Sequence, residues 1–396
     1  MADLKIIYEH DVLADTSLLE ASWLGSPTFI FIPDKRNSSS TWLDHIVESI
    51  APEFSRDFFG ILTSGSTGEP KLILGKKVHS ERLVRLLHKF QDSNSVSETV
   101  CILPLTYSYA FINQWLWAYI FKRRLRVTLG FREPDNLQKS LSRARNAMLC
   151  MVGGQIPLLR KYFPEAVFPG IIRLHFAGDR FPQEQLELLH QSFPNARIYN
   201  NYGCAEAMPR LTLRRAEDSF QADHIGYALP GIEMIADNEK RLLFRSPYGA
   251  VAYINDAGFH TIRPDEWIPS GDLGEPLDDG GWRLLGRATV VFKRYGEKIS
   301  PPQLLATVKC NWHGEDSFYK EVDQSGEDAC ILVLSPRPDT QEVRRVLMGF
   351  RDNYTRPHWP LRIESLEQIP LLPNGKTDIL GLAKAQGKQI HWRQRI

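Results

Sequence analysis

Apolar and polar positions alternate along the chain in a pattern that predicts short strands separated by amphipathic helices. The alternation is clearest between residues 124 and 235, where β-rich apolar segments follow helical ones. Strands are expected at residues 125–129, 148–152, 171–177 and 197–200, and helices at residues 137–147 and 182–193. Strand and helix in regular order predict an α/β fold with helices flanking a parallel sheet. Ligands of such sheets bind beyond the carboxyl ends of the strands.

The segments on either side extend this prediction. A capped amphipathic helix is expected at residues 82–90, and residues 225–295 are β-rich, with Asp-Gly and Gly-Gly turns at 279–281. The C-terminal segment holds another α/β alternation. We therefore expect a large N-terminal domain of parallel and mixed sheets with a β-rich subdomain, followed by a smaller α+β domain.

Length and composition fit an ordinary globular protein. The 396 residues carry a formal net charge of +1, which gives no electrostatic reason to expect nucleic acid as a partner. The five cysteines are far apart and lack C-x-x-C spacing, which indicates reduced thiols and excludes a zinc or disulfide framework. No apolar run is long enough to span a bilayer, and the charged N-terminus lacks a signal-peptide core. A cytoplasmic protein is expected.

A loop rich in glycine and hydroxyl groups separates two apolar runs. Its residues are Thr63, Ser64, Gly65, Ser66, Thr67, Gly68, Glu69, Pro70 and Lys71. Glycines let backbone N–H groups converge on an anion, the hydroxyls add donors, and Lys71 adds a cation. The P-loop of ATPases is excluded, because Pro70 precedes the lysine and no Ser or Thr follows it. The loop predicts a phosphate site; the alternative is a plain Ser/Gly/Pro turn.

Further motifs follow this loop in a fixed order. They are Leu103-Pro104-Leu105, Ala177-Gly178-Asp179, Tyr202-Gly203-x-x-Glu206, Ser270-Gly271-Asp272-Leu273, Gly286-Arg287, Lys293-x-x-Gly296-x-Lys298 and Pro373-Asn374-Gly375-Lys376. In this order and spacing the chain resembles the adenylate-forming superfamily, which includes acyl- and aryl-CoA synthetases, adenylation domains of nonribosomal peptide synthetases and beetle luciferases. The resemblance covers residues 58–385.

The resemblance implies an ATP-dependent reaction. A carboxylate attacks the α-phosphorus of MgATP to give an acyl-adenylate and pyrophosphate, and a thiol then displaces AMP. Such chemistry depends on positioned charge. Lys376 would bridge the attacking carboxylate and the α-phosphate, and Glu206 would help to hold Mg²⁺. The residues implied for the nucleotide are Thr63, Ser64, Gly65, Ser66, Thr67, Gly68, Lys71, Gly178, Asn200, Asn201, Tyr202, Gly203, Asp272 and Arg287.

Taken without the family, these residues have plainer interpretations. Asp272 is equally typical of a turn or helix cap, and Glu206 of a solvated acid at a helix start. Arg287 is typical of a surface ion pair, and Lys376 of an exposed lysine after an Asn-Gly turn.

The family also implies a division into domains. We expect an N-terminal AMP-binding domain at residues 1–285, a hinge at 286–290 and a mobile C-terminal lid at 291–396. Lys376 would serve adenylation, whereas the segment around Gly296 would face the thiol channel after the lid rotates. Thr289 stands where the family often has an acid, so the pivot residue stays open.

Three departures from the family pattern stand out. The segment before the phosphate loop is short, Ala205 replaces the threonine before the motif glutamate, and Tyr107 replaces a common histidine. The threonine hydroxyl normally contacts the α-phosphate, and its loss costs ~1.5–3 kcal/mol if nothing replaces it. A nucleotide-binding pseudoenzyme is therefore an alternative to an active ligase.

The acyl substrate is expected to lie near Tyr107, Tyr109, Asn113 and Gly178. No aspartate occurs at 107–113 to pair an ammonium, so an α-amino acid is disfavoured. Aromatic residues there suggest an aryl or acyl carboxylate, unless they are simply core. Coenzyme A is the favoured acceptor and a carrier-protein phosphopantetheine the alternative. Candidate contacts to the coenzyme A 3′-phosphate are Arg210, Arg214 and Arg215.

Overall fold

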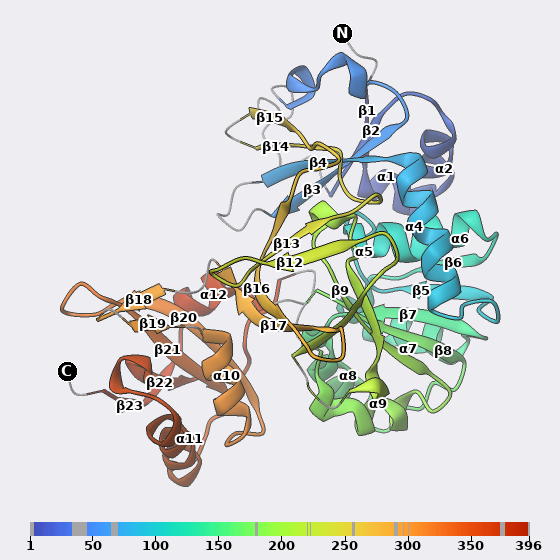
Figure 1. Cartoon of the computed structure of the whole chain (residues 1–396). Coiled ribbons are helices and arrows are strands. Elements are labelled where there is room, and N and C mark those ends of the chain that lie inside the picture. Colours follow the sequence, from blue (N-terminus) through green and yellow to red (C-terminus); the bar gives the residue numbers. More distant parts are fainter. Residues whose placement is uncertain are drawn as a thin grey trace. The chain divides into compact units, whose positions relative to one another are not determined.

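The structure, a computed structural model, describes residues 4–33, 46–64, 70–178, 181–219, 221, 223–255, 258–288, 292–295, 297–299, 301–372 and 377–394. The chain divides into two compact units, whose elements are labelled in Figure 1. The first comprises Met1–Ile235, Leu243–Ser270 and Pro276–Arg283, and the second Ala236–Leu242, Gly271–Glu275 and Leu284–Ile396. The expected domain limits and the hinge at 286–290 stay predictions.

A six-stranded sheet has the order β1-β2-β3-β4-β14-β15. Its strands are β1 (Lys5–Tyr8), β2 (Phe29–Ile32), β3 (Phe58–Ser64), β4 (Pro70–Lys76), β14 (Ala252–Asn255) and β15 (Gly258–Thr261). The first three are parallel, and β4, β14 and β15 continue the sheet in antiparallel pairs. All four side chains of β2 (Phe-Ile-Phe-Ile) are buried, as is typical of a strand covered on both faces. The β3–β4 hairpin carries the expected phosphate loop.

An eleven-stranded sheet has the order β12-β13-β16-β17-β11-β10-β9-β8-β7-β5-β6. Its strands are β5 (Glu98–Cys101), β6 (Arg124–Val127), β7 (Ala147–Met151), β8 (Ile171–Phe176), β9 (Arg197–Tyr202), β10 (Thr212–Arg215), β11 (His224–Ala228), β12 (Glu233–Ala236), β13 (Arg241–Arg245), β16 (Ile268–Pro276) and β17 (Trp282–Arg287). Strands β5 to β9 pair in parallel, which confirms the predicted alternation. The β-rich prediction is also confirmed, since β10, β11 and β17 pair antiparallel beside β9.

The helices of the first unit are α1 (Glu9–Ala14), α2 (Ser17–Leu24), α4 (Lys77–Phe90), α5 (Ser108–Ala110), the π-helical η3 (Phe111–Leu116), α6 (Trp117–Ile120), α7 (Pro134–Ser142), α8 (Ile156–Tyr162) and α9 (Leu186–Ser192). The helix expected at 137–147 ends at Ser142, before a turn in which Asn146 has φ +46°. The aromatic helix is core: the rings of Phe111 and Trp115 pack against Trp23 at centroid distances of 5.9 and 5.6 Å. These two rings therefore belong to the hydrophobic core.

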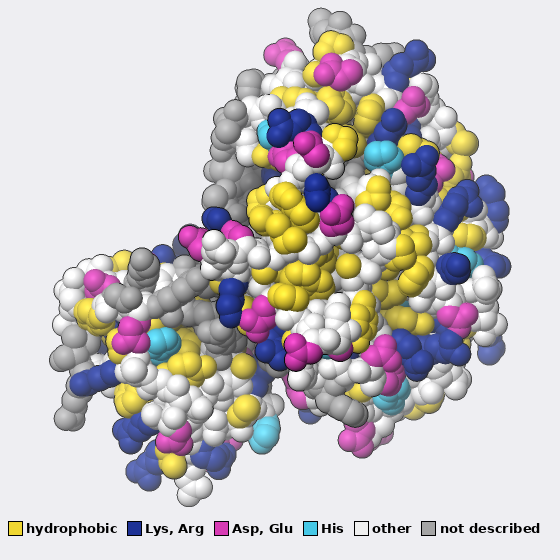
Figure 2. All heavy atoms as spheres, viewed as in Figure 1, with side chains coloured by type: hydrophobic (Ala, Val, Ile, Leu, Met, Phe, Trp, Pro, Cys, Tyr) yellow, Lys and Arg dark blue, Asp and Glu magenta, His cyan; other side chains and the backbone are white. Residues whose placement is uncertain are grey.

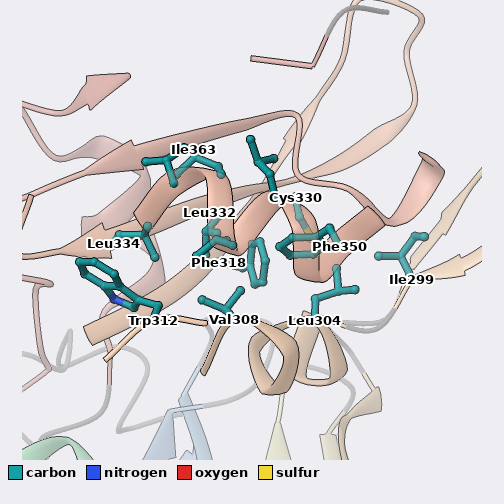
Figure 3. Close-up of a cluster of buried hydrophobic side chains, with 13 residues drawn as sticks. Ile299, Leu304, Val308, Trp312, Phe318, Cys330, Leu332, Leu334, Phe350 and Ile363 are labelled. Atoms are coloured by element: carbon teal, nitrogen blue, oxygen red, sulfur yellow. The ribbon is translucent and has the colours of Figure 1, made fainter. Parts of the chain in front are cut away.

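The second unit contains an α+β layer of its own. Its elements are β18 (Phe292–Arg294), β19 (Glu297–Ile299), α10 (Pro301–Lys309), β20 (Glu315–Val322), β21 (Asp328–Ser335), α11 (Thr340–Asn353), β22 (Arg362–Ser365), α12 (Ile379–Lys384) and β23 (Gln389–Arg393). The four-stranded sheet has the order β20-β21-β22-β23. In Figure 3 the side chains of Leu304 and Val308 on α10 point toward Phe318 and Leu332 of the sheet, and all four are buried. This packing gives the C-terminal segment its own hydrophobic core.

Charge is mixed on the face shown in Figure 2. Basic and acidic side chains of the described residues are interspersed over most of this face, in keeping with the net charge of +1. No helix within the described ranges is long and apolar enough to cross a membrane.

Candidate active site

The β3–β4 hairpin positions the two ends of the expected phosphate loop. Thr63 and Lys71 are paired residues of this hairpin, and the Thr63 hydroxyl donates a hydrogen bond to the Lys71 carbonyl at 3.4 Å. Gly65, Ser66, Thr67 and Gly68 lie outside the described residues, and Ser64 is described only as the last residue of β3. The structure thus places Thr63 and Lys71 together and leaves the loop itself a prediction.

Lys71 and Glu206 form an ion pair, although 135 positions separate them in the sequence. The Lys71 Nζ atom lies 2.9 Å from Glu206 Oε1, and each side chain is 21% exposed. The same Nζ lies 3.8 Å from the centroid of the Tyr253 ring on β14. A partly exposed pair of this kind has a small net stabilising effect, so both charges can exchange partners with a charged ligand. The hairpin cation and the motif acid therefore share one site.

A short turn after β9 presents Glu206. The Leu211 N–H donates to the Tyr202 carbonyl at 2.9 Å, and the Ala250 N–H donates to the Glu206 carbonyl at 2.8 Å. Gly203 has no room for a side chain, because an added Cβ would lie 2.0 Å from the Pro209 carbonyl oxygen. Close backbone approach therefore requires glycine at this position of the motif.

The remaining residues expected at the strand ends are buried or glycine. Asn200 Nδ2 donates to the His224 carbonyl at 3.2 Å, and Asn201 Nδ2 donates to the Phe176 carbonyl at 2.9 Å. These amides brace β9 against neighbouring segments. Tyr202 is also buried, and Gly178 is exposed with φ +85° after β8. The four residues thus lie at the carboxyl ends of adjacent parallel strands, where the sequence predicts a ligand.

Asp272 and Arg287 meet within the second unit. Arg287 Nη1 donates to Asp272 Oδ1 at 3.0 Å, with the Asp272 side chain 9% exposed and that of Arg287 50% exposed. Asp272 follows Gly271, whose φ of +83° turns the middle of β16. The pair predicted for the ribose is therefore formed. Lys376, Gly296 and Thr289 lie outside the described residues, so their roles stay predictions.

The expected substrate residues differ in burial, and Tyr109 lies beside the buried Arg210. Tyr107 is half-buried, whereas Tyr109 and Asn113 are 4% and 5% exposed. Sequence reasoning missed His175 as a neighbour and assigned Arg210 to coenzyme A, yet each is only 1% exposed. The sequence contained two signals of buried polar groups. One is a histidine, His175, inside the apolar run of β8, and the other is an arginine, Arg210, that follows an apolar turn.

The structure corrects the assignment of two of the three arginines that were candidates for binding the coenzyme A phosphate. Arg214 is 2% exposed; its Nε donates to the His224 carbonyl at 2.7 Å and its Nη2 to Gln183 Oε1 at 2.8 Å. Arg215 is exposed and lies 3.7 Å from Glu217. Arg214 is therefore a buried structural group, and the burial of both Arg210 and Arg214 keeps them from a phosphate at the molecular surface.

Residues 33–250 match the family model described as AMP-binding enzyme. The chain belongs to this AMP-binding enzyme family. The resemblance to the adenylate-forming superfamily is thereby confirmed.

Curated relatives and solved structures agree with this membership. A D-alanine–D-alanyl carrier protein ligase from Lactiplantibacillus plantarum is 23% identical over 86% of this chain and 72% of its own length. A plipastatin synthase from Bacillus subtilis is 23% identical over 82% of this chain and 10% of its own length. ATP-bound MatB from Rhodopseudomonas palustris has a TM-score of 0.75 at 14% identity, covering 96% of this chain and 88% of that one. O-succinylbenzoate coenzyme A synthetase from Bacillus subtilis, in complex with AMP, has a TM-score of 0.69 at 15% identity, with coverages of 97% and 88%. These structures establish the shared fold.

Proposed function

We propose that this AMP-binding enzyme is an ATP-dependent ligase that joins a carboxylic acid to a thiol. The Lys71–Glu206 pair is the observation that carries the proposal, because it brings a loop cation and a motif acid together beyond parallel strands. The acid would attack the α-phosphorus of ATP, forming an acyl–phosphate bond as the bond to pyrophosphate breaks. The thiol sulfur would then attack the acyl carbonyl, and AMP would leave with the bonding electrons.

Each protein group has a defined electrostatic task. Lys71 would turn from Glu206 to the departing phosphates, and Lys376 would neutralise charge between the attacking carboxylate and the α-phosphate. Asp272, held by Arg287, would accept hydrogen bonds from the ribose hydroxyls. None of these residues forms a covalent intermediate; they position the reactants and balance the developing charge.

Glu206 is the residue we assign to Mg²⁺. No group of three or more His, Cys, Asp or Glu side chains capable of holding a metal occurs within the described ranges. One carboxylate nevertheless fits Mg²⁺, which proteins usually hold through one or two carboxylates together with substrate phosphates and water. When bound, Mg²⁺ neutralises phosphate charge. Glu206 would orient the metal–nucleotide complex from its turn after β9.

The thiol acceptor we favour is the phosphopantetheine of a carrier protein. The curated relatives described above include a carrier-protein ligase and a plipastatin synthase, which supports this acceptor. Coenzyme A is the second candidate, supported by the coenzyme A synthetase among the structural neighbours. Burial of Arg210 and Arg214 removes two of the three candidate contacts to the coenzyme A 3′-phosphate.

The proposal is tested by ATP–pyrophosphate exchange across a panel of carboxylic acids. At least one acid should support exchange, and Lys376→Ala should lower its rate by about 100-fold or more, since a charge-neutralising group acts in the transition state. Lys384→Ala, which removes an exposed lysine of α12, is the matched control and should keep the wild-type rate. AMP binding without exchange for any acid would establish the pseudoenzyme alternative. Product analysis with carrier protein and with coenzyme A then identifies the acceptor.

A further inference from the structure

A cluster of polar side chains is buried at the carboxyl end of the parallel strands. It consists of Tyr109 on α5, Asn113 on η3, Cys150 on β7, His175 on β8 and Arg210 after the Glu206 turn. Their exposed fractions are 4%, 5%, 0%, 1% and 1%. We call these five residues the polar cluster. They come from four segments of the first unit, because α5 and η3 are consecutive in the chain, and the fold brings these segments together.

The sheet register places members of the polar cluster on one face. Cys150 pairs with His175 across β7 and β8, and His175 pairs with Tyr199 across β8 and β9. The rings of His175 and Tyr199 are stacked with centroids 5.1 Å apart. Paired residues of parallel strands point to the same side, so Cys150 and His175 share a face. The guanidinium carbon of Arg210 lies 5.3 Å from the centroid of the Tyr109 ring.

Many polar atoms of the cluster are unsatisfied. Within the part of the chain that the structure describes, no hydrogen-bond partner exists for Arg210 Nε and Nη2, for both His175 ring nitrogens, or for either amide atom of Asn113. Buried polar groups in folded proteins are almost always hydrogen-bonded, because leaving them unpaired is unfavourable. Several unpaired groups at one place therefore indicate a partner that is supplied from outside the chain.

The charge balance of the polar cluster identifies the sign of that partner. Burial lowers the pKa of Arg210, but an arginine remains protonated in proteins, so the cluster carries a positive charge. Burial and the nearby Arg210 lower the pKa of His175, which is thus neutral, and burial raises the pKa of Tyr109. Tyr109 and Cys150 raise the pKa of Arg210 against the larger effect of burial, and among the described residues no carboxylate forms an ion pair with Arg210. A buried cation without a carboxylate partner requires an anion.

We propose that the polar cluster binds a second acidic group of the carboxylic acid substrate, so that the enzyme selects dicarboxylic or similarly anionic acids. This inference rests on the proposed ligase function. Arg210 would bind the distal carboxylate through Nε and Nη2, a fork that matches two carboxylate oxygens. Neutral His175, the Asn113 amide and the Tyr109 hydroxyl would complete its hydrogen bonds. The reacting carboxylate would extend toward Gly178, the exposed end of the β8 strand that also carries His175.

The same arrangement disfavours an α-amino acid substrate. An ammonium group at the polar cluster would lie beside the Arg210 cation in a region from which water is excluded, where repulsion between like charges is strong. Among the described residues, no acidic side chain pairs with Arg210 to offset that repulsion. The polar cluster thus distinguishes this chain from relatives named for D-alanine.

Matched acids test the proposal. Pyrophosphate exchange is measured with dicarboxylic acids of increasing length and with the monoamide of each, which removes one charge without changing the length. Wild-type kcat/KM should favour the diacid by about 100-fold, as expected for a site built around a charged hydrogen-bond group. Arg210→Met should remove this preference while leaving the KM for ATP unchanged. Arg124→Met, at an exposed position of β6, is the control and should keep the preference.

Direct binding separates the two proposals from each other. Calorimetry without ATP should detect the preferred diacid on the wild type and no binding on Arg210→Met. Exchange that proceeds equally well with diacids and monoamides overturns the anion selectivity and leaves the ligase function standing. Binding of a diacid without any exchange overturns the ligase function and supports the anion site. If Arg210→Met does not fold, Asn113→Leu takes its place, and the wild-type comparison alone still decides selectivity.

Discussion

Replacement of Gly203 by alanine perturbs the candidate site through a single methyl group. The added Cβ would lie 2.0 Å from the Pro209 carbonyl oxygen, 2.8 Å from its carbonyl carbon and 2.9 Å from the Arg210 Cα. All three contacts are with backbone, so no side-chain rotation relieves them. Since Cβ contacts below 3.0 Å essentially never occur, the strand end and the Pro209 segment must separate by about an ångström.

The expected magnitude follows from this forced separation. Overpacking of a close contact costs about 1–3 kcal/mol of unfolding free energy. In a domain of 150–250 residues each kcal/mol shifts the melting temperature by about 2–4 °C, so a decrease of about 2–12 °C is expected. The turn from Gly203 also carries Glu206, whose carboxylate lies 2.9 Å from Lys71. A displacement of about 1 Å at a catalytic group lowers rates by about 100-fold, so exchange should fall more than stability alone explains.

Thermal unfolding and pyrophosphate exchange are measured on the same preparation of Gly203→Ala. Gly280→Ala is the matched control, because Gly280 has open space around its Cβ position and a positive φ of +83°. It should lose about 1 kcal/mol from backbone strain and keep its exchange rate. A Gly203→Ala protein that melts with the wild type and exchanges at its rate would refute the close-approach reasoning.

Two further predictions concern the second unit. Burial alone would raise the pKa of Asp323. Hydrogen bonds from Ser325, from backbone N–H groups and from buried Arg294 have the larger combined effect and lower the pKa from 3.8 to about 2. The ionised Asp323 carboxylate stabilises the fold fully at pH values above its pKa in the unfolded chain, and this effect disappears as the pH falls toward 2. Asp323→Asn should therefore lower the free energy of unfolding by about 3 kcal/mol at pH 7. Urea unfolding should also show that the stability of this variant depends less on pH in the acid range. An unchanged acid profile would contradict this. Leu332→Ala, at a fully buried position, should lose about 2–5 kcal/mol by urea unfolding, whereas Leu380→Ala at a 70% exposed position should stay within about 0.5 kcal/mol.

Strong periodicity made the parallel sheet predictable. The apolar run at 171–177 corresponds to β8 at Ile171–Phe176, and the run at 148–152 to β7 at Ala147–Met151. Pattern alone did not predict β1 at Lys5–Tyr8, because only one of its four side chains, Ile7, is buried and the strand shows no clear apolar run. It also did not predict the π-helical turns at Phe111–Leu116, since their apolar spacing is read equally well as an α-helix.

Some residues of the candidate site could be predicted from sequence motifs, whereas the burial of others depends on the tertiary structure around them. Motif order identified Lys71, Glu206, Asp272 and Arg287, and the structure brings the first two together in one unit and the last two in the other. Burial could not be predicted for Arg210, because it depends on packing from elements far apart in sequence. The sequence alone does not distinguish an arginine in an exposed polar stretch from one that is buried beside an aromatic ring. Long-range packing therefore determines which arginines are buried, and this the sequence pattern does not show.

The distinction between motif and environment also limits what family membership implies about the substrate. The motif residues are predicted to act on groups that do not depend on the acid, namely the phosphates and ribose of ATP and the reacting carboxylate. In our proposal the residues of the polar cluster contact the part of the acid beyond that carboxylate. A buried charge without a partner costs several kcal/mol, so the Arg210 charge affects the binding free energy of the acid more than many apolar contacts do. A relative named for D-alanine has to accommodate an ammonium group, whereas Arg210, 1% exposed beside Tyr109, would repel one. The identity of the acid is consequently better inferred from the charge of this cluster than from the names of relatives that are 23% identical.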